Sequence, residues 1–120
     1  MERFITLADG KDYEQIPLSE VIYLEAAAAY TLFHLKCAEK GEQTKQQSYH
    51  LGAYEDKLNT NFYRIGRSYI INRQFISRIT PKGLITLRCS DLSIALQCSK
   101  TIWKTLKTIL IPQFKGSKKR

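Results

Sequence analysis

The stretch NFYRIGRSYIIN, residues 61–72, combines two arginines and three large aromatic side chains with aliphatic residues. It also opens the strongly basic part of the chain. Residues 62–120 contain 13 Lys or Arg and one acidic residue, whereas residues 1–61 contain 6 Lys or Arg and 10 acidic residues. The formal net charge of +8 is therefore divided into −4 and +12. A charge distribution of this kind produces a directional field, and a polyanion is the usual partner of such a field.

The length and composition suit one folded domain. The chain has 120 residues, of which 43% are hydrophobic and 25% are charged, as in ordinary globular proteins. A chain of this size buries enough surface to fold without metal or disulfide staples. No run approaches the roughly 20 apolar residues that span a bilayer. The N-terminus carries no apolar export segment, so we expect a cytoplasmic protein.

The residues that could carry catalysis or bind metal are few. The three cysteines, Cys37, Cys89 and Cys98, show no C-x-x-C spacing and are interpreted as small buried hydrophobes. His34 and Cys37 differ by an odd step, so a strand would place them on opposite faces. Gly66 stands alone, without the Gly-rich loop that cradles phosphates. We therefore expect that the protein has no enzymatic activity and binds no metal, no cofactor and no small-molecule substrate.

The pattern of apolar residues predicts a mostly β domain with one or two short helices. Short runs rich in β-forming residues, bounded by turn signals, predict strands at residues 21–24, 30–35, 46–51, 75–80, 84–89 and 93–98. Turns are predicted at residues 40–42, 81–83 and 90–92. A short helix is expected at residues 53–58, and a longer amphipathic helix begins at the N-cap Ser99 and stops at Pro112.

These elements divide the chain into three parts. Residues 1–14 are polar with weak periodicity, and we expect an extended or loosely docked N-terminal arm. Residues 15–112 are expected to form the folded domain, and residues 113–120 a basic C-terminal tail. The segment from Glu25 to Ala29 has strong helix propensity but lies between two predicted strands. It is too short for a stable helix, so we interpret it as a small-residue loop, with a continuous strand or a helical turn as the alternative.

The basic half has the residue types that nucleic-acid binding requires. Several arginines and lysines lie on neighbouring predicted elements and could form one basic ridge: Arg64, Arg67, Arg73, Arg78, Lys82, Lys100 and Lys104. A solvated β surface is the alternative. The aromatic residues do not match the exposed motif of an RNA-recognition sheet, and the one long helix has no helix-turn-helix partner. Residue chemistry alone thus indicates a basic, β-rich domain that binds nucleic acid through loops or strands.

The order of elements from about Ile16 to Leu110 resembles a LytTR-type DNA-binding domain. The matching segments are IPLSEVIYLEA at residues 16–26, Tyr30, the short helix ending at Lys57-Leu58, FYRIGRSYIIN at residues 62–72, the strand at residues 76–79 and Cys98-Ser99-Lys100. This resemblance implies a bacterial transcription regulator, built as an elongated assembly of small antiparallel β-sheets with flanking short helices. It also implies that three loops between elements enter successive major-groove segments of duplex DNA.

The resemblance implies roles for individual residues. Arg67 corresponds to a base- or phosphate-contacting position, and Lys100 to a contacting position before the last helix. The loop of residues 27–30 corresponds to a third contacting loop, with Tyr30 or Thr31 as its reader. With the neighbouring basic and hydroxyl side chains, the candidate DNA-binding set is Ala28, Ala29, Tyr30, Thr31, Arg64, Arg67, Ser68, Arg73, Ser99, Lys100 and Lys104.

The chain departs from the family pattern at two places. The family usually has His before the signature arginine, where this chain has Gly66, and polar residues in the loop where this chain has alanines. Both changes remove hydrogen-bonding groups. The leading hypothesis is a sequence-specific duplex-DNA-binding transcription regulator, acting as two copies on repeated half-sites. The alternatives are a protein-interaction module of the same fold that pairs with another regulator, and a general RNA or single-strand binder.

Overall fold

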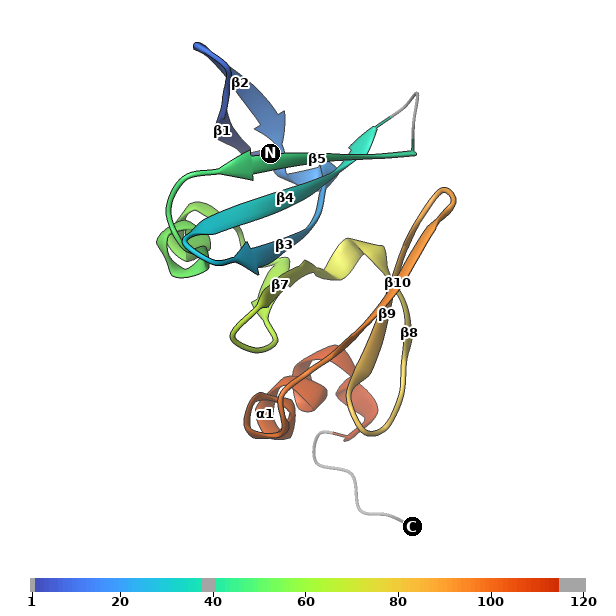
Figure 1. Ribbon diagram of the computed structural model, residues 1–120. Coiled ribbons are helices and arrows are strands. Elements are labelled where there is room, and N and C mark those ends of the chain that lie inside the picture. Colours follow the sequence, from blue (N-terminus) through green and yellow to red (C-terminus); the bar gives the residue numbers. More distant parts are fainter. Residues whose placement is uncertain (1, 38–40, 115–120) are drawn as a thin grey trace.

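The computed structural model describes residues 2–37 and 41–114, and it consists mainly of β-strands. The molecule is elongated, with principal extents of 58 × 29 × 28 Å. Three antiparallel sheets follow one another along the chain, with two, five and three strands (Figure 1). An α-helix, α1 (Lys100–Leu110), and short 3-10 turns accompany the sheets. The predicted arrangement of small antiparallel sheets with short flanking helices is confirmed.

The N-terminal segment, expected as an extended or loosely docked arm, is a β-hairpin. Strands β1 (Phe4–Asp9) and β2 (Asp12–Pro17) pair in antiparallel register from Phe4↔Pro17 to Asp9↔Asp12. Gly10, with a φ of 66°, is the first residue of the two-residue turn, where a left-handed backbone favours glycine. The hairpin is anchored because alternate apolar side chains point into the core: Ile5, Leu7 and Ile16 are buried.

The central sheet has the strand order β5-β4-β3-β7-β6. Its strands are β3 (Val21–Ala27), β4 (Tyr30–Cys37), β5 (Gly41–Gln47), β6 (Phe62–Arg64) and β7 (Tyr69–Asn72). The alanine segment is partly strand and partly loop, the two structures that its sequence left open. Strand β3 continues through Ala27, which pairs with Tyr30, and Ala28 and Ala29 make the tight turn between them. Ala28 adopts a left-handed φ of 57°.

The segment between β5 and β6 differs from the sequence prediction. A strand was expected at residues 46–51, but β5 ends at Gln47 and Tyr49 has a φ of 76°, a left-handed backbone that no strand continues through. The expected helix is present as a 3-10 helix, η2 (Leu51–Lys57), which begins two residues earlier than predicted. The predicted turn at residues 40–42 lies partly outside the described residues, and Gly41 and Glu42 belong to β5.

The third sheet has the order β10-β9-β8 and agrees closely with the sequence prediction. Its strands are β8 (Ile76–Ile79), β9 (Leu84–Cys89) and β10 (Leu92–Gln97), joined by turns at the predicted places. The α1 helix follows directly. The Ser99 side chain accepts the backbone N–H of Ile102, as the N-cap prediction required. The remaining 3-10 turns are η1 (Leu18–Glu20), η3 (Arg73–Phe75) and η4 (Pro112–Phe114).

Two hydrophobic cores lie along the long axis. One joins the N-terminal hairpin, β3, β4 and η2, around Leu7, Leu24 and Phe33. The other joins the third sheet to α1, with Leu87 and Trp103 among its members. Cys89 and Cys98 are buried, as expected, and form no disulfide within the described residues, whereas the Cys37 side chain lies outside the described part. In the described chain, no helix is long and apolar enough to cross a membrane, and no group of ligand-type side chains could hold a metal ion.

Candidate nucleic-acid interface

The loop between β6 and β7, residues 65–68, is a tight and well-anchored projection. Ile65 is fully buried, and its backbone N–H donates to the carbonyl of Tyr69 at 3.0 Å, which closes the loop. Arg67 and Ser68, at the tip, are exposed. Burial of the aliphatic residue inside the loop therefore fixes the direction in which the two polar residues face solvent.

The Arg64 side chain holds this loop by hydrogen bonds to its backbone. Its guanidinium donates three hydrogen bonds: from Nε to the Gly66 carbonyl at 2.7 Å, from one terminal nitrogen to the Arg67 carbonyl at 3.1 Å, and from the other to Glu55 Oε2 at 3.0 Å. The planar arrangement of donors in arginine suits this simultaneous contact with three acceptors. Arg64 was predicted to contact DNA; in the structure its guanidinium donates two hydrogen bonds to backbone carbonyls of the loop and one to η2. Its carboxylate partner Glu55, on η2, was not identified from the sequence.

The turn between β3 and β4 lies directly beside this loop. The backbone N–H of Ala26 donates to the Ser68 carbonyl at 2.8 Å, and Glu25 pairs with Tyr69 across the sheet. Tyr30, at the end of the turn, is 46% exposed. Thr31 is fully buried and its hydroxyl donates to the Tyr49 carbonyl, so it does not face solvent. Of the two predicted readers in this turn, only Tyr30 is accessible.

The start of α1 lies on the other side of the same loop. The Ser99 backbone N–H donates to the Ile65 carbonyl at 2.8 Å, so both its N–H and its capping hydroxyl are used internally. Lys100 and Lys104 are exposed and lie one helical turn apart. The first turn of α1 contains no acidic residue. Within the described residues, the backbone N–H groups of Lys100 and Thr101 have no hydrogen-bond acceptor, and such groups at a helix N-terminus favour anions.

A tryptophan fixes the orientation of the helix. The indole N–H of Trp103 donates to the Pro81 carbonyl at 2.9 Å, in the turn between β8 and β9. The same turn contains Gly83, whose carbonyl accepts the Cys98 backbone N–H at 2.9 Å. Burial raises the pKa of the Cys98 thiol, which lies immediately before the helix cap. The position of Lys100 is thus set by the contacts of Cys98 before it and of Trp103 after it with the β8–β9 turn.

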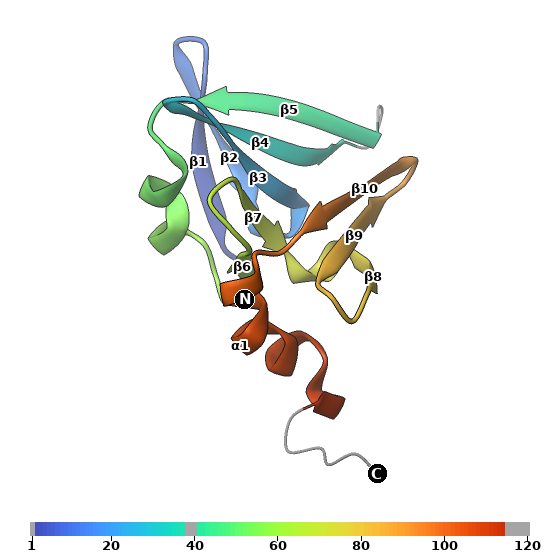
Figure 2. The same cartoon turned by 60° about the horizontal axis from the view of Figure 1, so that its bottom comes forward.

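Three segments that are distant in the sequence therefore form one contiguous surface, which we call the three-loop surface: residues 27–30, residues 65–68 and residues 99–104. Two backbone hydrogen bonds join them, Ala26 to Ser68 and Ser99 to Ile65. In Figure 1 the β3–β4 turn, the β6–β7 loop and α1 follow one another down the left side of the molecule, and the same order is visible in Figure 2. Arg67, Tyr30 and Lys100 consequently lie on neighbouring projections.

Other basic residues of the predicted ridge lie elsewhere. Arg73 is exposed on η3, at the opposite end of β7 from the β6–β7 loop, and its backbone N–H donates to the Asn61 carbonyl. Arg78 is on β8 and Lys82 is in the turn that follows it. Four residues of β7 separate Arg73 from the loop, about 13 Å at the usual rise per strand residue. The ridge is therefore interrupted, and only part of it belongs to the three-loop surface.

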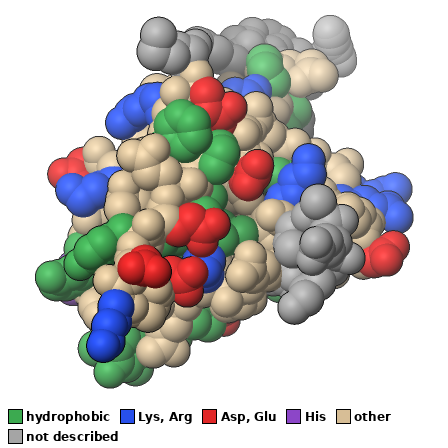
Figure 3. Space-filling view, turned by 90° about the horizontal axis from the view of Figure 1, so that it is seen from above, with side chains coloured by type: hydrophobic (Ala, Val, Ile, Leu, Met, Phe, Trp, Pro, Cys, Tyr) green, Lys and Arg blue, Asp and Glu red, His purple; other side chains and the backbone are tan. Residues whose placement is uncertain are grey.

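The N-terminal end of the molecule has a different character. The β1–β2 hairpin carries the exposed acidic residues Asp9, Asp12 and Glu14. In the view from this end, acidic side chains gather near the middle of the face among hydrophobic ones, and lysine and arginine side chains lie mainly toward its edges (Figure 3). The acidic residues that the sequence concentrates before residue 62 are thus prominent at this end of the molecule.

The comparisons with known proteins agree with this geometry. A family model for the LytTr DNA-binding domain matches residues 11–111. A solved structure, the LytTr DNA-binding domain of a Bacillus cereus protein described as a response regulator, is 27% identical with a TM-score of 0.68. That similarity covers 90% of this chain and 96% of the other. A search of curated proteins gave no match.

The fold and the three-loop surface are those of a DNA-binding regulator domain. The described residues contain one α-helix, α1, and therefore no helix-turn-helix pair. The chain belongs to the LytTR family of DNA-binding domains. The resemblance inferred from residues 16–110 is thereby confirmed.

Proposed function

We propose that the protein is a sequence-specific regulator of transcription whose three-loop surface docks into the major groove of duplex DNA. The contiguity of that surface supports the proposal, since two backbone hydrogen bonds hold the three projections side by side. Major-groove edges distinguish all four base pairs, so a few side chains on such projections are sufficient for sequence reading. Lysines and arginines around them would neutralise phosphates.

The residues differ in their proposed roles. Arg67, exposed at the loop tip, is placed to bind guanine with two hydrogen bonds, a contact worth about 1–3 kcal/mol of discrimination. Lys100 acts with the first backbone N–H groups of α1 on a phosphate, and Lys104 on a neighbouring one. Lysine is a point charge, so these contacts contribute affinity more than specificity. Tyr30 contacts the groove from the β3–β4 turn, where Ala28 and Ala29 allow close backbone approach.

The wider assignments follow from this function. Two copies acting on repeated half-sites would double the contact surface and lengthen the recognised sequence. We place the protein in the cytoplasm, where its DNA target is accessible, and assign it no cofactor. The functional unit is residues 15–112 with the N-terminal segment packed against it, and the basic residues 113–120 add non-specific attraction to DNA.

Selection of duplexes from a random library tests binding and specificity together. We expect the chain to enrich a defined sequence, and binding to that sequence to weaken steeply as salt concentration rises. Arg67→Ala should remove the preference among duplexes. Arg73→Ala, which removes the same exposed charge at the far end of β7, should retain it. Preference that is intact in the Arg67 variant would overturn the role of this residue.

The protein-interaction module remains a second candidate because of two specific features. The β3–β4 turn presents Ala28 and Ala29 in place of polar side chains, and the β6–β7 loop has Gly66 before Arg67. Both reduce the number of groups that could read bases. If the chain retains no duplex at low salt but forms a complex with another LytTR regulator, this second function is favoured.

A further inference from the structure

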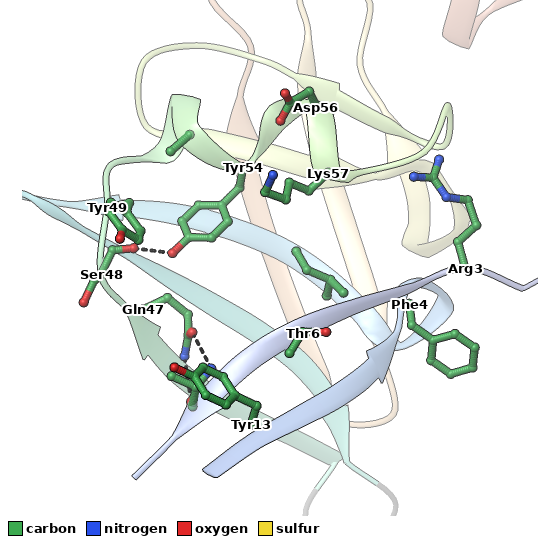
Figure 4. A pocket seen from close by; sticks show the side chains of 13 residues that line it. Arg3, Phe4, Thr6, Tyr13, Gln47, Ser48, Tyr49, Tyr54, Asp56 and Lys57 are labelled. Carbon is green, nitrogen blue, oxygen red and sulfur yellow. Dashed lines mark hydrogen bonds between the residues drawn. The ribbon is translucent and has the colours of Figure 1, made fainter. Parts of the chain in front are cut away.

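A groove whose lining residues are all outside the three-loop surface lies between the N-terminal hairpin and η2. It has a volume of 870 Å³, within the range of ligand-binding clefts. One wall is β1, from Arg3 to Ala8, and the other is formed by the segment after β5 and by η2. Figure 4 shows the side chains that line it: β1 runs along one side, Tyr49 and Tyr54 face it across the groove, and Gln47 lies at one end.

The wall made by β1 is a strand edge with unpaired backbone groups. In an antiparallel ladder, residues alternate between bonding the partner strand and pointing their N–H and C=O away from it. Two observations fix the alternation here. The Leu18 N–H donates to the Arg3 carbonyl, so Arg3 faces β2, whereas both backbone groups of Ala8 bond the Gln47 side chain on the opposite side. Phe4 and Thr6 share the parity of Ala8, so their backbone groups point into the groove.

The Gln47 amide already acts as a short substitute for a neighbouring strand. Its Oε1 accepts the Ala8 N–H at 2.8 Å, and its Nε2 donates to the Ala8 carbonyl at 3.0 Å. This is the pair of hydrogen bonds that a strand residue would make. Within the described residues, no such partner is present for Phe4 and Thr6. The edge is therefore covered at one position and open at the next two along the groove.

The side chains around the groove indicate what could occupy it. Exposed aromatic residues gather here: Phe4 is 51%, Tyr13 is 76% and Tyr49 is 71% exposed. Tyr54 packs edge-to-face on Phe33 and donates its hydroxyl to the Ser48 carbonyl, which keeps the far wall in place. Arg3 and Lys57 contribute positive charge, and Asp56 a single negative charge. An extended peptide would pair with the open edge of β1, its apolar side chains would contact the aromatic residues, and an acidic residue would face Arg3 and Lys57.

We propose that this groove binds an extended peptide segment of a partner protein, which adds a strand to the edge of β1. The segment pairs with the backbone of Phe4 and Thr6, presents an apolar side chain to the tyrosines, and places a carboxylate near Arg3 and Lys57. Main-chain pairing supplies affinity in this mode of recognition, and the side-chain contacts supply specificity. The groove is thereby a protein-binding site, and none of the residues that line it belongs to the three-loop surface.

Panning a phage-displayed library of random decapeptides against the full chain tests this proposal. We expect recovered peptides to carry apolar and acidic residues and to bind as labelled synthetic peptides in fluorescence anisotropy. Thr6→Pro removes the N–H that points into the groove, and should weaken binding on the order of tenfold or more. Gln15→Pro is the matched control. Gln15 pairs with Thr6, so its N–H points to the other edge of the hairpin and binding should be retained.

A second measurement does not depend on the folding of a variant. N-methylation of the peptide at alternate residues should abolish binding for one set of positions and leave the other set active, because a strand donates only every second N–H to one neighbour. Failure to recover any peptide, or binding that is indifferent to Thr6→Pro and to N-methylation, would overturn the proposal. Self-association that Thr6→Pro abolishes would overturn it in favour of a second copy as occupant. None of these readouts involves DNA.

Discussion

Replacing Arg64 with lysine should weaken DNA binding although the charge of the protein is unchanged. The guanidinium of Arg64 contacts three acceptors at once, the carbonyls of Gly66 and Arg67 and the carboxylate of Glu55. Lysine has a single ammonium group and cannot reach all three in this geometry. In Arg64→Lys the loop loses its internal support, and Arg67 is no longer held in one orientation.

The size of the effect follows from the number of bonds lost. Lysine can retain one of the three contacts, so two are lost, at about 0.5–1.5 kcal/mol each. The Arg64 side chain is 32% exposed and solvent screens part of the interaction, which leaves a cost of about 1–2 kcal/mol. If the loop must be ordered to bind, the dissociation constant rises roughly 5- to 30-fold. Fluorescence anisotropy with a labelled, selected duplex at fixed salt measures this change.

The control is Arg78→Lys, the same chemical change at an exposed position on β8. It should bind the duplex as the unaltered protein does. Amide hydrogen exchange in the same samples should accelerate in residues 65–68 of Arg64→Lys alone. An Arg64→Lys variant that binds with unchanged affinity would refute the structural role assigned to the guanidinium.

Three further predictions concern single residues. A Cβ added at Gly66 would meet no atom within 4 Å, so Gly66→His should fold normally. It should bind duplex DNA on the order of fivefold more tightly in anisotropy titrations, through one added contact, and unchanged or weaker binding would contradict this. Gly83 has a φ of 92°, and an added Cβ would lie 3.0 Å from the Trp103 ring. Gly83→Ala should therefore lower the free energy of unfolding by about 1–3 kcal/mol in urea denaturation. An unchanged urea midpoint would count against this. Burial raises the pKa of Cys98 above its ordinary 9.0, so the stability linked to the protonated thiol is complete below that pH and is lost as pH rises through the folded-state pKa. Cys98→Ala should therefore flatten the alkaline decrease in unfolding free energy, and an equally steep decrease would contradict the assignment.

Local sequence signals were sufficient for the C-terminal half of the fold. Ser99 caps α1 and Pro112 follows its end, and the turns of the third sheet contain the Gly, Pro and Asp residues that turns require. The N-terminal hairpin was missed, although alternation of Ile5 and Leu7 with a following Gly10 is a usable hairpin signal. The end of β5 carried no such signal. Tyrosine has no preference for the left-handed φ found at position 49, where the carbonyl accepts a hydrogen bond from the Thr31 hydroxyl of the neighbouring strand.

The candidate site was predictable as a set of segments but not as a geometry. The resemblance identified three candidate contacting segments, and the structure joins them through the Ala26 and Ser99 backbone hydrogen bonds. The sequence could not show which basic side chains are available to DNA and which bond other residues of the protein, because the bonding partners are distant in the sequence. Arg64 meets Glu55 only after η2 folds beside the loop, and Thr31 faces the interior because of the register of β4 with its neighbours.

The most direct test of the three-loop surface is titration of the isotopically labelled chain with a selected duplex, followed by amide chemical shifts. The largest shifts should fall at residues 28–30, 66–68 and 99–101, with small changes along β1 and η3. Shifts concentrated on the third sheet or on the N-terminal hairpin, with the three loops unaffected, would contradict the account.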